Sequence, residues 1–500
     1  MTGGRQSGAT DCVDVTVIGG GPAGAAAARQ LAAFGRSLVL LARPASRRAL
    51  AESLPPSCTK LFDKLGVRLA VDGAGFLRAT GNTVHWGAGG ERVEPFAPGA
   101  LGYQVARDAF DALLVQTARD AGAVVDHDAV VRRVERDNDG WAVWYDSSTG
   151  SRSIRTRCVL DCSGRAGVVA RDGWRRASAG ARTMAVVGIW ERDDGWSALV
   201  PDETHTIVES YAGGWAWSVP ISATRRYFTV MIDPELTRLP GRQQLADAYA
   251  VEIGRTERIS ALTDGARPCE EPWARDASPY TADQFGDMGL LLVGDAASFV
   301  DPLSSFGVKK ALASAWLAAV VANTWFLDAS AGRAALDLFN RRERDMYDHL
   351  QRQASAMARS AATAHASEFW VERADDPGVM EGELDVGSLR TDPRVLAAFE
   401  ELKRRPTVQL RAAAMLRVVP RAVVRGDRVA LEDHLATPAL SAGVRYARSV
   451  DLVLLKDIAQ AHDQVPDMFD SYNRRAPAAS LPDFLGALST LIGLEMLTLA

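Results

Sequence analysis

Two short apolar runs near the N-terminus flank a glycine-rich turn. Residues 13–18 (VDVTVI) and 37–41 (SLVLL) are mostly β-branched or aliphatic, which predicts strands buried on both faces of a parallel sheet. The alanine-rich segment between them, residues 25–34, predicts a helix that ends at Gly35. The order strand, helix, strand predicts a βαβ unit at the start of the fold.

Helical and strand periodicities follow one another along the rest of the chain. Residues 105–122 repeat apolar side chains at helical spacing, and residues 182–235 alternate as in an antiparallel sheet. The segment MGLLLVGDAASFVDP, residues 288–302, predicts another buried strand that runs into a turn. Residues 307–327 predict a long helix with few charges, which we expect to be well buried.

This order of elements predicts an α/β fold with three parts, because 500 residues are too many for one ordinary core. We expect a Rossmann-like, dinucleotide-binding domain made of residues 10–180 and 276–335, with an antiparallel β-sheet inserted at residues 181–275. Residues 336–500 are expected to form a mainly helical lobe, which a hairpin around Gly426 could make winged-helix-like. Such a lobe could recognise a substrate or only buttress the first domain.

Composition and charge argue against several classes of protein. The formal net charge is −5 with both signs interspersed, so there is no basic stripe for nucleic acid. Five cysteines are few and odd in number, which fits a reducing compartment, and Cys158 and Cys162 lack the second Cys or His pair of a metal site. The polar N-terminus lacks the apolar core of a signal peptide, and no stretch reaches the length of a membrane span. We therefore expect a cytoplasmic protein without a membrane or nucleic-acid partner.

The glycine turn carries a specific chemical signal. Gly19, Gly21 and Gly24 form a G-x-G-x-x-G motif between the first predicted strand and helix. In that context the first glycine permits a tight turn, the second lets backbone approach a pyrophosphate, and the third allows close packing of helix on strand. The helix N-terminus then faces the negative charge. The motif predicts a dinucleotide site.

The second strand lacks the acid that usually ends it in such a unit. An Asp or Glu there normally holds the ribose hydroxyls, but this strand ends at Ala42, followed by Arg43. Either another group binds that ribose or the adenosine is held less tightly. Arg43 could accommodate a 2′-phosphate instead, but the remaining motifs favour a flavin.

Five further motifs belong together. AESL at residues 51–54 resembles G-E-S-L, and RDAFDALL from Arg107 resembles R-x-x-F-D-x-x-L. VLDCSGR is similar to a D-A-S/T-G-R turn, GDAASFVDP from Gly294 to G-D-A-A-x-x-x-D-P, and WAWSVP at residues 215–220 to W-x-W-x-I-P. These are motifs of the flavin-dependent halogenases and their geranylgeranyl-reductase-like relatives. The resemblance covers roughly residues 12–335 and implies FAD as the cofactor.

The resemblance also implies which residues hold FAD. Asp295 would accept hydrogen bonds from the ribitol hydroxyls; its alternative role is a helix N-cap. Arg107 would reach the cofactor, and Glu52 carries over as a residue of the cofactor region, with a solvated carboxylate as the alternative. The expected cofactor-binding residues are Gly19, Gly21, Gly24, Glu52, Ser53, Arg107, Gly164, Gly294, Asp295, Pro302 and Gly307.

Two departures from the halogenase pattern change the expected reaction. The resemblance implies a lysine that passes the oxidised halogen to the substrate, but the matching stretch FLRATGNTVHWG has Ala79 at that position. The adjacent Arg78 is a poor replacement, because a guanidinium stays protonated. At the halide site, Phe306 replaces the hydroxyl residue beside Gly307. We therefore expect reduced FAD and O2 to transfer oxygen to the substrate instead of oxidising a halide.

The predicted function is an FAD-dependent monooxygenase acting on an aromatic or indole-type substrate, free or carried on a peptide or carrier protein. Electrons would come from NAD(P)H directly or from a partner flavin reductase, because no second dinucleotide fingerprint is visible. The chain is also similar to flavoproteins that hydroxylate a peptidyl tryptophan. Three alternatives stay open: a halogenase with relocated catalytic groups, an FAD-dependent reductase or dehydrogenase, and a non-catalytic flavin-binding maturation partner.

The candidate catalytic residues are Trp215, Trp217, His85 and Lys309. The two tryptophans are two apart, so in a strand both indoles share a face, either as core packing or as a wall beside the flavin. His85 lies near the lost lysine, although a lone histidine is more often structural. Lys309 and Lys310 open the long helix, where positive charge is unfavourable, and one of them could neutralise a reduced flavin.

Overall fold

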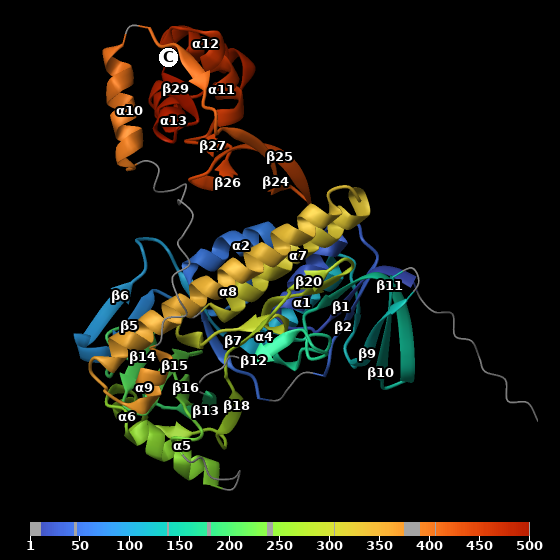
Figure 1. Ribbon diagram of the computed structural model, residues 1–500. Helices are drawn as coiled ribbons and strands as arrows, with labels where there is room; N and C mark the ends of the chain where they lie inside the picture. The colour runs from blue at the N-terminus through green and yellow to red at the C-terminus, as the bar shows by residue number, and fades with distance from the viewer. Residues whose placement is uncertain are drawn as a thin grey trace, which may run out of the picture. The chain divides into compact units, whose positions relative to one another are not determined.

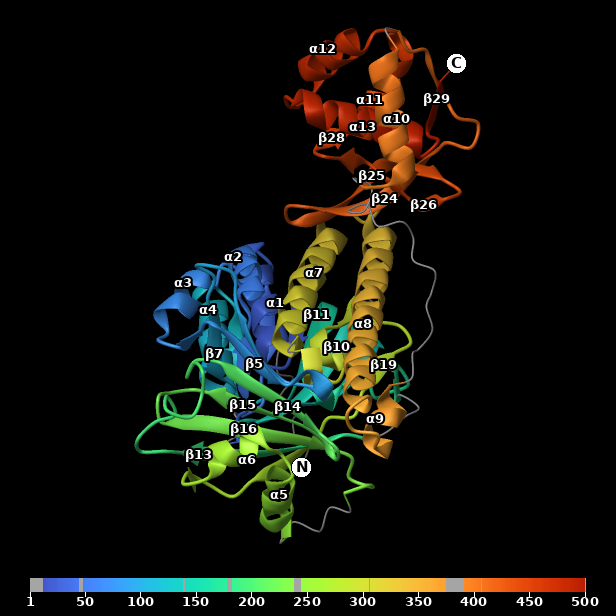
Figure 2. The same ribbon diagram turned by 90° about the vertical axis from the view of Figure 1, so that its left-hand side faces the viewer.

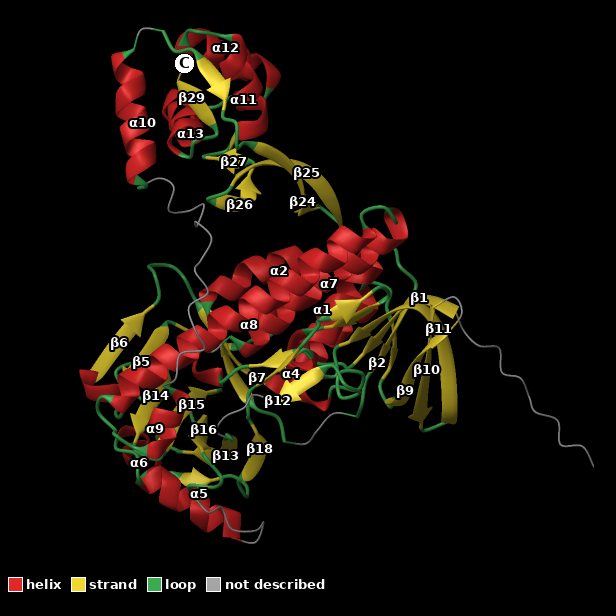
Figure 3. Cartoon of the chain, in the orientation of Figure 1, coloured by secondary structure: helices red, strands yellow, loops and turns green. Residues whose placement is uncertain are grey.

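The computed structural model describes residues 12–44, 48–137, 140–177, 182–237, 244–304, 306–374, 391–405 and 407–499 (Figure 1). The chain divides into two compact units, Met1–Pro377 and Gly378–Ala500. Both units contain helices as well as strands (Figure 3). The predicted α/β class is confirmed.

A mostly parallel sheet forms the base of the first unit. Its strands are β1 (Cys12–Ile18), β2 (Leu38–Leu41), β8 (Val124–Asp126), β9 (Val130–Asp137), β10 (Gly140–Ser147), β11 (Gly150–Asp161), β20 (Gly286–Asp287) and β21 (Leu290–Leu292). The order is β8-β2-β1-β11-β21-β20, with parallel neighbours except for β20 and β21, and the antiparallel β9 and β10 extend the sheet beside β11. Val15, Val17 and Leu40 are fully buried, as expected for strands covered on both faces.

Helices pack against this sheet and against one another. α1 (Pro22–Ala33) completes the predicted βαβ unit and contacts α4 (Arg107–Asp120) and α7 (Gly307–Leu327). α7 also packs along the long α8 (Gly332–Ala362), and Figure 2 shows the two helices side by side. Ala315 and Ala318 of α7 are fully buried. Their small side chains let the neighbouring elements approach α7 closely.

α7 corrects one expectation from the sequence. Among the described residues it is the one helix long and apolar enough to cross a membrane, by length and composition, whereas we expected no such stretch. In this fold 72% of its most apolar window is buried inside the protein, which is how the core helix of a globular domain behaves.

A second, mostly antiparallel sheet lies in the same unit. Its strands are β5 (Gly81–His85), β6 (Glu91–Pro95), β13 (Met184–Glu191), β14 (Thr206–Tyr211), β15 (Gly214–Pro220), β16 (Arg225–Ile232), β17 (Arg267–Pro268) and β18 (Trp273–Asp276). The order is β17-β13-β16-β15-β14-β5-β6, and β18 pairs with β13. Most strands come from residues 181–275, but β5 and β6 come from the segment before them, and β5 pairs with β14 in parallel. The second sheet therefore combines strands from two separate segments of the chain, one before residue 181 and one after it.

Shorter elements complete the first unit. A small sheet has the order β3-β7-β4, and another has the order β12-β19-β22. The elements are β3 (Ala51–Leu54), α2 (Thr59–Leu65), α3 (Arg68–Gly73), β4 (Leu77–Ala79), β7 (Gly102–Ala106), β12 (Arg175–Ala177), α5 (Leu245–Gly254), α6 (Arg258–Thr263), β19 (Tyr280–Ala282), β22 (Ser298–Phe299) and α9 (Glu368–Arg373).

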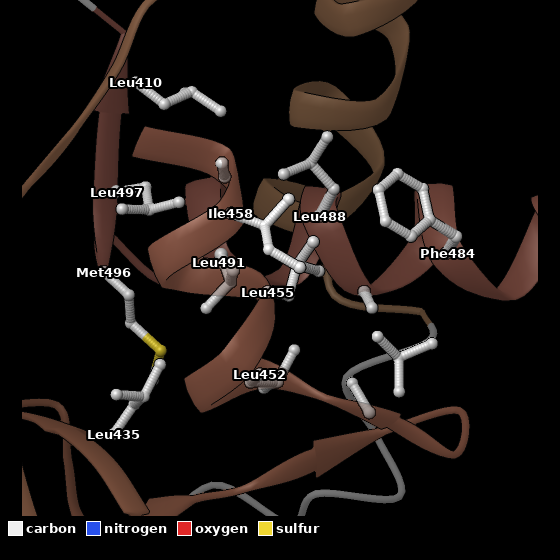
Figure 4. Close-up of a cluster of buried hydrophobic side chains, with 14 of the residues drawn as sticks. Leu410, Leu435, Leu452, Leu455, Ile458, Phe484, Leu488, Leu491, Met496 and Leu497 are labelled. Atoms are coloured by element: carbon white, nitrogen blue, oxygen red, sulfur yellow. The ribbon is translucent and has the colours of Figure 1, made fainter. Parts of the chain in front are cut away.

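The second unit has a core of its own. Its elements are α10 (Pro393–Arg404), β23 (Leu410–Ala412), β24 (Arg417–Arg425), β25 (Arg428–Thr437), β26 (Leu440–Val444), β27 (Tyr446–Ala447), β28 (Val450–Asp451), α11 (Leu452–Ala461), α12 (Val465–Arg475), α13 (Leu481–Gly493) and β29 (Leu497–Leu499). Figure 4 shows Leu455 and Ile458 of α11 packed with Leu488 and Leu491 of α13. The hairpin expected around Gly426 joins β24 to β25 and precedes the last three helices in the chain. A winged-helix-like arrangement stays a prediction.

Candidate cofactor and active site

One large cavity, of about 1230 Å³, lies within the first unit. The glycine turn after β1 lines one part of it, and residues of β13 to β16 line another. Of the predicted cofactor residues, the cavity is lined by Gly19, Gly21, Glu52, Ser53, Arg107, Gly164, Asp295, Pro302 and Gly307. Gly24 and Gly294 are not among the described residues that line it.

The geometry of the glycine turn fits a dinucleotide. Gly19 has φ +109°, and a Cβ there would lie 2.4 Å from the Cys162 carbonyl oxygen. A Cβ on Gly24 would lie 1.8 Å from the Gly19 carbonyl oxygen, so this glycine is needed for packing. At Gly21, by contrast, an added Cβ would meet no protein atom closer than 4.0 Å. The backbone at Gly21 therefore faces open cavity at the N-terminus of α1, where a pyrophosphate would be held.

Arg107 sits at the centre of a charged network in the cavity wall. Its Nε and Nη2 donate to the two carboxylate oxygens of Asp111 at 2.9 and 3.0 Å, and its Nη1 donates to Glu52 Oε1 at 3.4 Å. Burial disfavours the guanidinium charge, but Asp111 and Glu52 outweigh it and raise the pKa of Arg107 above its usual range. Burial raises the pKa of Glu52, against the opposing effect of Arg107. This arrangement fixes one cation at the cavity surface.

Asp111 was missing from the predicted site residues. Its signal was present in the sequence, because Arg107 and Asp111 are four apart on a predicted helix and an i,i+4 pair shares a face. Pairing of β3 with β7 brings Glu52 opposite Val105, two residues before Arg107. The pairing of two distant strands could not be foreseen from spacing alone.

Asp295 follows the strand β21, in the short helical turn Gly294–Ala296. The N-cap of that turn is Val293 and has no side-chain hydrogen bond, so capping is not the role of Asp295 here. Its Oδ1 accepts a hydrogen bond from Lys310 Nζ at 3.2 Å, and its side chain is partly exposed to the cavity. The carboxylate is available to accept hydrogen bonds from sugar-type hydroxyls, as ribitol recognition requires.

Among the described residues that line the cavity near Ala42, none is an acid at the end of the second strand, where one usually holds the ribose. Ala42 lies against the glycine turn, since a Cβ on Gly20 would be 2.7 Å from the Ala42 Cβ. Arg43 lines the cavity there, and α4 contributes Gln116 and Arg119. A larger side chain at residue 42 would crowd the turn. The nearby polar groups are an amide, two guanidinium groups and the imidazole of His127, which contacts Arg119. Gln116 and His127, whose pKa is lowered by burial and by Arg119, are the neutral candidates for the ribose hydroxyls.

Trp215 and Trp217 lie on one face of β15, as their spacing predicted. Their rings are stacked, with centroids 4.7 Å apart and an interplanar angle of 25°, and both line the cavity. Trp215 also meets Trp86 edge-on at 6.4 Å and belongs to a buried cluster with Trp370. The pair thus serves as core packing and as cavity wall at once.

Asp301 adds a carboxyl group beside this aromatic wall. It lines the cavity between Phe299 and Leu303, which pack in the same cluster as the tryptophans. Its Oδ1 accepts a hydrogen bond from the Leu303 amide at 3.2 Å. Burial raises the pKa of Asp301 to about 6. Of this Asp-Pro pair, only Pro302 was among the predicted cofactor residues.

The other predicted catalytic candidates lie elsewhere. His85 Nε2 is 2.9 Å from Glu91 Oε2, its partner across β5 and β6. Lys309 Nζ lies 4.5 Å from the centroid of the Phe306 ring. Neither His85 nor Lys309 is among the described residues that line the cavity, whereas Phe306 and Lys310 are. Their catalytic roles stay predictions that this geometry does not favour.

Residue 79, where the resemblance implies the halogenation lysine, has no access to the cavity. Ala79 is fully buried in β4 and is not among the described lining residues. The adjacent Arg78 lies over the Tyr103 ring and pairs with Asp72 at 3.1 Å. Neither side chain could deliver a reagent from the cavity to a substrate.

Comparisons with known proteins support FAD as the ligand of this cavity. Residues 12–354 match the FAD binding domain family. A tryptophan 2-halogenase of Chondromyces crocatus is 33% identical over 322 residues, which are 61% of this chain and 60% of that protein. The chain thus matches less than two thirds of the length of this curated relative.

Two solved structures share the fold over nearly the whole chain. CmlS, a flavin-dependent halogenase, has a TM-score of 0.74 at 22% identity and covers 98% of this chain and 96% of its own. QhpG, a peptidyl tryptophan dihydroxylase essential for tryptophylquinone cofactor biogenesis, has a TM-score of 0.68 at 23% identity and covers 97% and 99%. With the glycine turn and the family match, these findings give one conclusion: the chain belongs to the FAD binding domain family, as a halogenase-like flavoenzyme with FAD as its cofactor.

Proposed function

We propose that this chain is an FAD-dependent monooxygenase that hydroxylates an indole-type or other aromatic ring, carried on a peptide or carrier protein. The observation that carries the proposal is the make-up of the cavity. Trp215 and Trp217 form a wall in it, while Ala79, at the place of the halogenation lysine, is buried outside the described lining. Bound FAD supplies the redox chemistry with O2, and the residues of the chain select and orient the ring.

The aromatic wall suits a flat, electron-rich substrate. A ring placed against Trp217 would stack on it, and the surrounding apolar side chains would exclude water from the reacting atoms. Asp301 can accept a hydrogen bond from a ring N–H or O–H group. As a carboxylate it can also take the proton that the ring loses when oxygen is added. The substrate ring would then be selected by the tryptophans of β15, and its proton would be removed by Asp301 in the loop after β22.

The relatives support an indole-type ring. The curated relative is named for tryptophan, and QhpG is named for tryptophan within a peptide. A substrate held on a peptide or carrier would present only its ring to the cavity. The electrons would come from NAD(P)H or from a reduced flavin supplied by a partner reductase, and the expected location is the cytoplasm.

A tryptophan-directed halogenase is the second candidate, because the relative with 33% identity is a halogenase. A relocated lysine would then be needed. Lys310 is the lysine among the described lining residues, but its Nζ donates to Asp295 Oδ1 and to the Ser298 carbonyl. These two hydrogen bonds already occupy the ammonium group, which disfavours the role.

One experiment separates the candidates. FAD-loaded protein would be supplied with NADH, a flavin reductase, O2 and a tryptophan-containing peptide, with and without chloride or bromide. The monooxygenase proposal requires a product that gains oxygen derived from isotopically labelled O2, independent of halide. A halogen-containing product would support the second candidate instead.

The remaining two candidates give different results in the same assay. A reductase or dehydrogenase would convert its substrate without O2. A non-catalytic maturation partner would bind FAD, yet consume NADH no faster than free flavin does.

A further inference from the structure

Lys310 is a buried cation in the wall of the FAD cavity. It lies in the first turn of α7, and 4% of its side chain is exposed. Its Nζ donates to Asp295 Oδ1 at 3.2 Å and to the carbonyl of Ser298. Its neighbour Lys309 has the same charge but lies over the Phe306 ring, outside the described cavity lining. The two lysines therefore form a natural pair for comparison.

A buried lysine in this place has to be stabilised by negative groups. The N-terminus of a helix carries partial positive charge, and removal of an ammonium from water is costly. Asp295 supplies one negative charge, and Glu343 of α8, which is 5% exposed, supplies a second that interacts with Lys310.

Glu343 is also connected to the turn that holds Asp295. It is hydrogen-bonded to Ser314, whose Oγ accepts a hydrogen bond from the Gly294 amide at 3.0 Å. Burial raises the pKa of Glu343 to about 7, against the opposing effect of Lys310. Glu343 therefore changes its charge within the physiological pH range.

We infer that Lys310 stabilises the reduced form of the bound FAD, and that Glu343 reduces this effect when it is ionised. Reduction adds negative charge to the flavin, so a fixed cation in the cavity wall favours the reduced form over the oxidised form. The negative charge of ionised Glu343 offsets part of the positive charge of Lys310 and so opposes this effect. Four other groups interact with the charge of Asp295: Arg107, Glu52, Arg175 and Tyr280. These groups are unchanged in all the variants proposed below.

The test is the midpoint potential of FAD bound to the full-length protein. Dithionite, which is oxidised to sulfite, transfers two electrons to FAD, and one proton is taken up from solvent near neutral pH. The potential is read against indicator dyes. Lys310→Met is expected to lower the potential and to reduce the preference for reduced over oxidised FAD by roughly tenfold. The matched control, Lys309→Met, is expected to shift it much less.

Glu343→Gln provides the second, opposite arm. It is expected to raise the potential at pH 8, where the wild-type carboxyl is ionised, and to change it little at pH 6. Lys310→Met could misfold because Glu343 is left without its partner. The double variant Lys310→Met/Glu343→Gln removes both charges together, and at pH 6, where Glu343→Gln alone changes the potential little, it should keep the lower potential. Equal shifts for the two lysine variants, or an unchanged potential in the double variant, would overturn the inference. The measurement needs FAD but no substrate, so it is independent of the proposed reaction.

Discussion

The indole rings of Trp215 and Trp217 stack on one face of β15, with centroids 4.7 Å apart. Trp215 is 2% exposed and continues into a cluster with Trp86 and Trp370, whereas Trp217 is only partly buried. The pair therefore runs from the protein core to the cavity surface. The Trp215 ring belongs to the core, and the Trp217 ring is the more exposed of the two in the cavity wall.

Substitution should separate these two roles. Trp215→Ala is expected to lower the free energy of unfolding by about 3–5 kcal/mol, because a buried indole leaves a large void. Trp217→Ala should cost less stability but weaken binding of indole to the FAD-loaded protein. Denaturant unfolding and titration of the flavin absorbance measure the two effects. Equal losses of stability with unchanged indole binding would contradict the assignment.

The glycine turn permits a similar separation for the cofactor. Gly24→Ala should destabilise the fold, because its Cβ would overlap the Gly19 carbonyl oxygen, whereas Gly21→Ala places a methyl group in open cavity. We expect Gly21→Ala to fold normally and to bind FAD more weakly. Thermal unfolding of the FAD-free proteins and FAD titration distinguish the two. A Gly21→Ala protein with unchanged affinity would show that the pyrophosphate lies elsewhere.

Asp295→Ala should weaken FAD binding by roughly ten- to a hundredfold, the loss typical of a charged hydrogen-bond acceptor. The purified variant should be less yellow than the wild type. Asp194→Ala is a suitable control, because its side chain is 77% exposed and it does not line the cavity. Binding is measured by the change in flavin fluorescence. If both variants keep wild-type affinity, the carboxylate does not hold the ribitol.

Glu343 should make stability fall as pH rises. Its pKa is 4.5 in its ordinary state and about 7 in the folded protein, so between these values the folded state binds more protons than the unfolded state. By linkage, the slope of unfolding free energy against pH is then negative, and the loss across the window is about 3 kcal/mol. Glu343→Gln should remove this part of the pH dependence. Denaturant midpoints at pH 5 and pH 8 test it, and parallel pH profiles for both proteins would refute it.

Ala79→Lys should not create a halogenase. Residue 79 is fully buried and outside the described cavity lining, so the new ammonium would be enclosed without a partner. We expect destabilisation by several kcal/mol and no halide-dependent product. Ala79→Leu controls for the added volume. Halogenation by the lysine variant would mean that this strand can open onto the cavity.

Local patterns in the sequence were sufficient for much of the fold. The βαβ unit and the shared face of Trp215 and Trp217 depend on neighbours in the chain, and both follow from periodicity. The parallel pairing of β5 with β14 joins residues more than a hundred positions apart, and no local pattern specifies it. The second sheet therefore contains β5 and β6, which were expected to belong to the preceding domain.

The candidate site shows the same division. The glycine turn and Asp295 were recognisable from motifs with a physical role. Lys309 and Lys310 are adjacent on a helix, so their side chains point in different directions. Only the structure shows that it is the Lys310 ammonium that contacts Asp295, while that of Lys309 lies over Phe306. Glu343 lies in a helix with no motif, and only the packing of α8 on α7 brings it to Lys310. Asp301 was seen only as part of a motif, because its burial in the cavity wall depends on packing that no local pattern specifies.

The aromatic wall depends on chain that lies beyond the matched family region, which ends at residue 354. The Trp86 indole donates to the Met357 carbonyl, and Trp370 donates to the carbonyl of Tyr211 at 2.8 Å. A protein cut after residue 354 would keep every described residue that lines the cavity but lose these two supports. The position of the aromatic wall therefore depends on a stretch of chain that contributes no described residue to the cavity lining, so a change in that stretch could alter the wall without altering any lining residue.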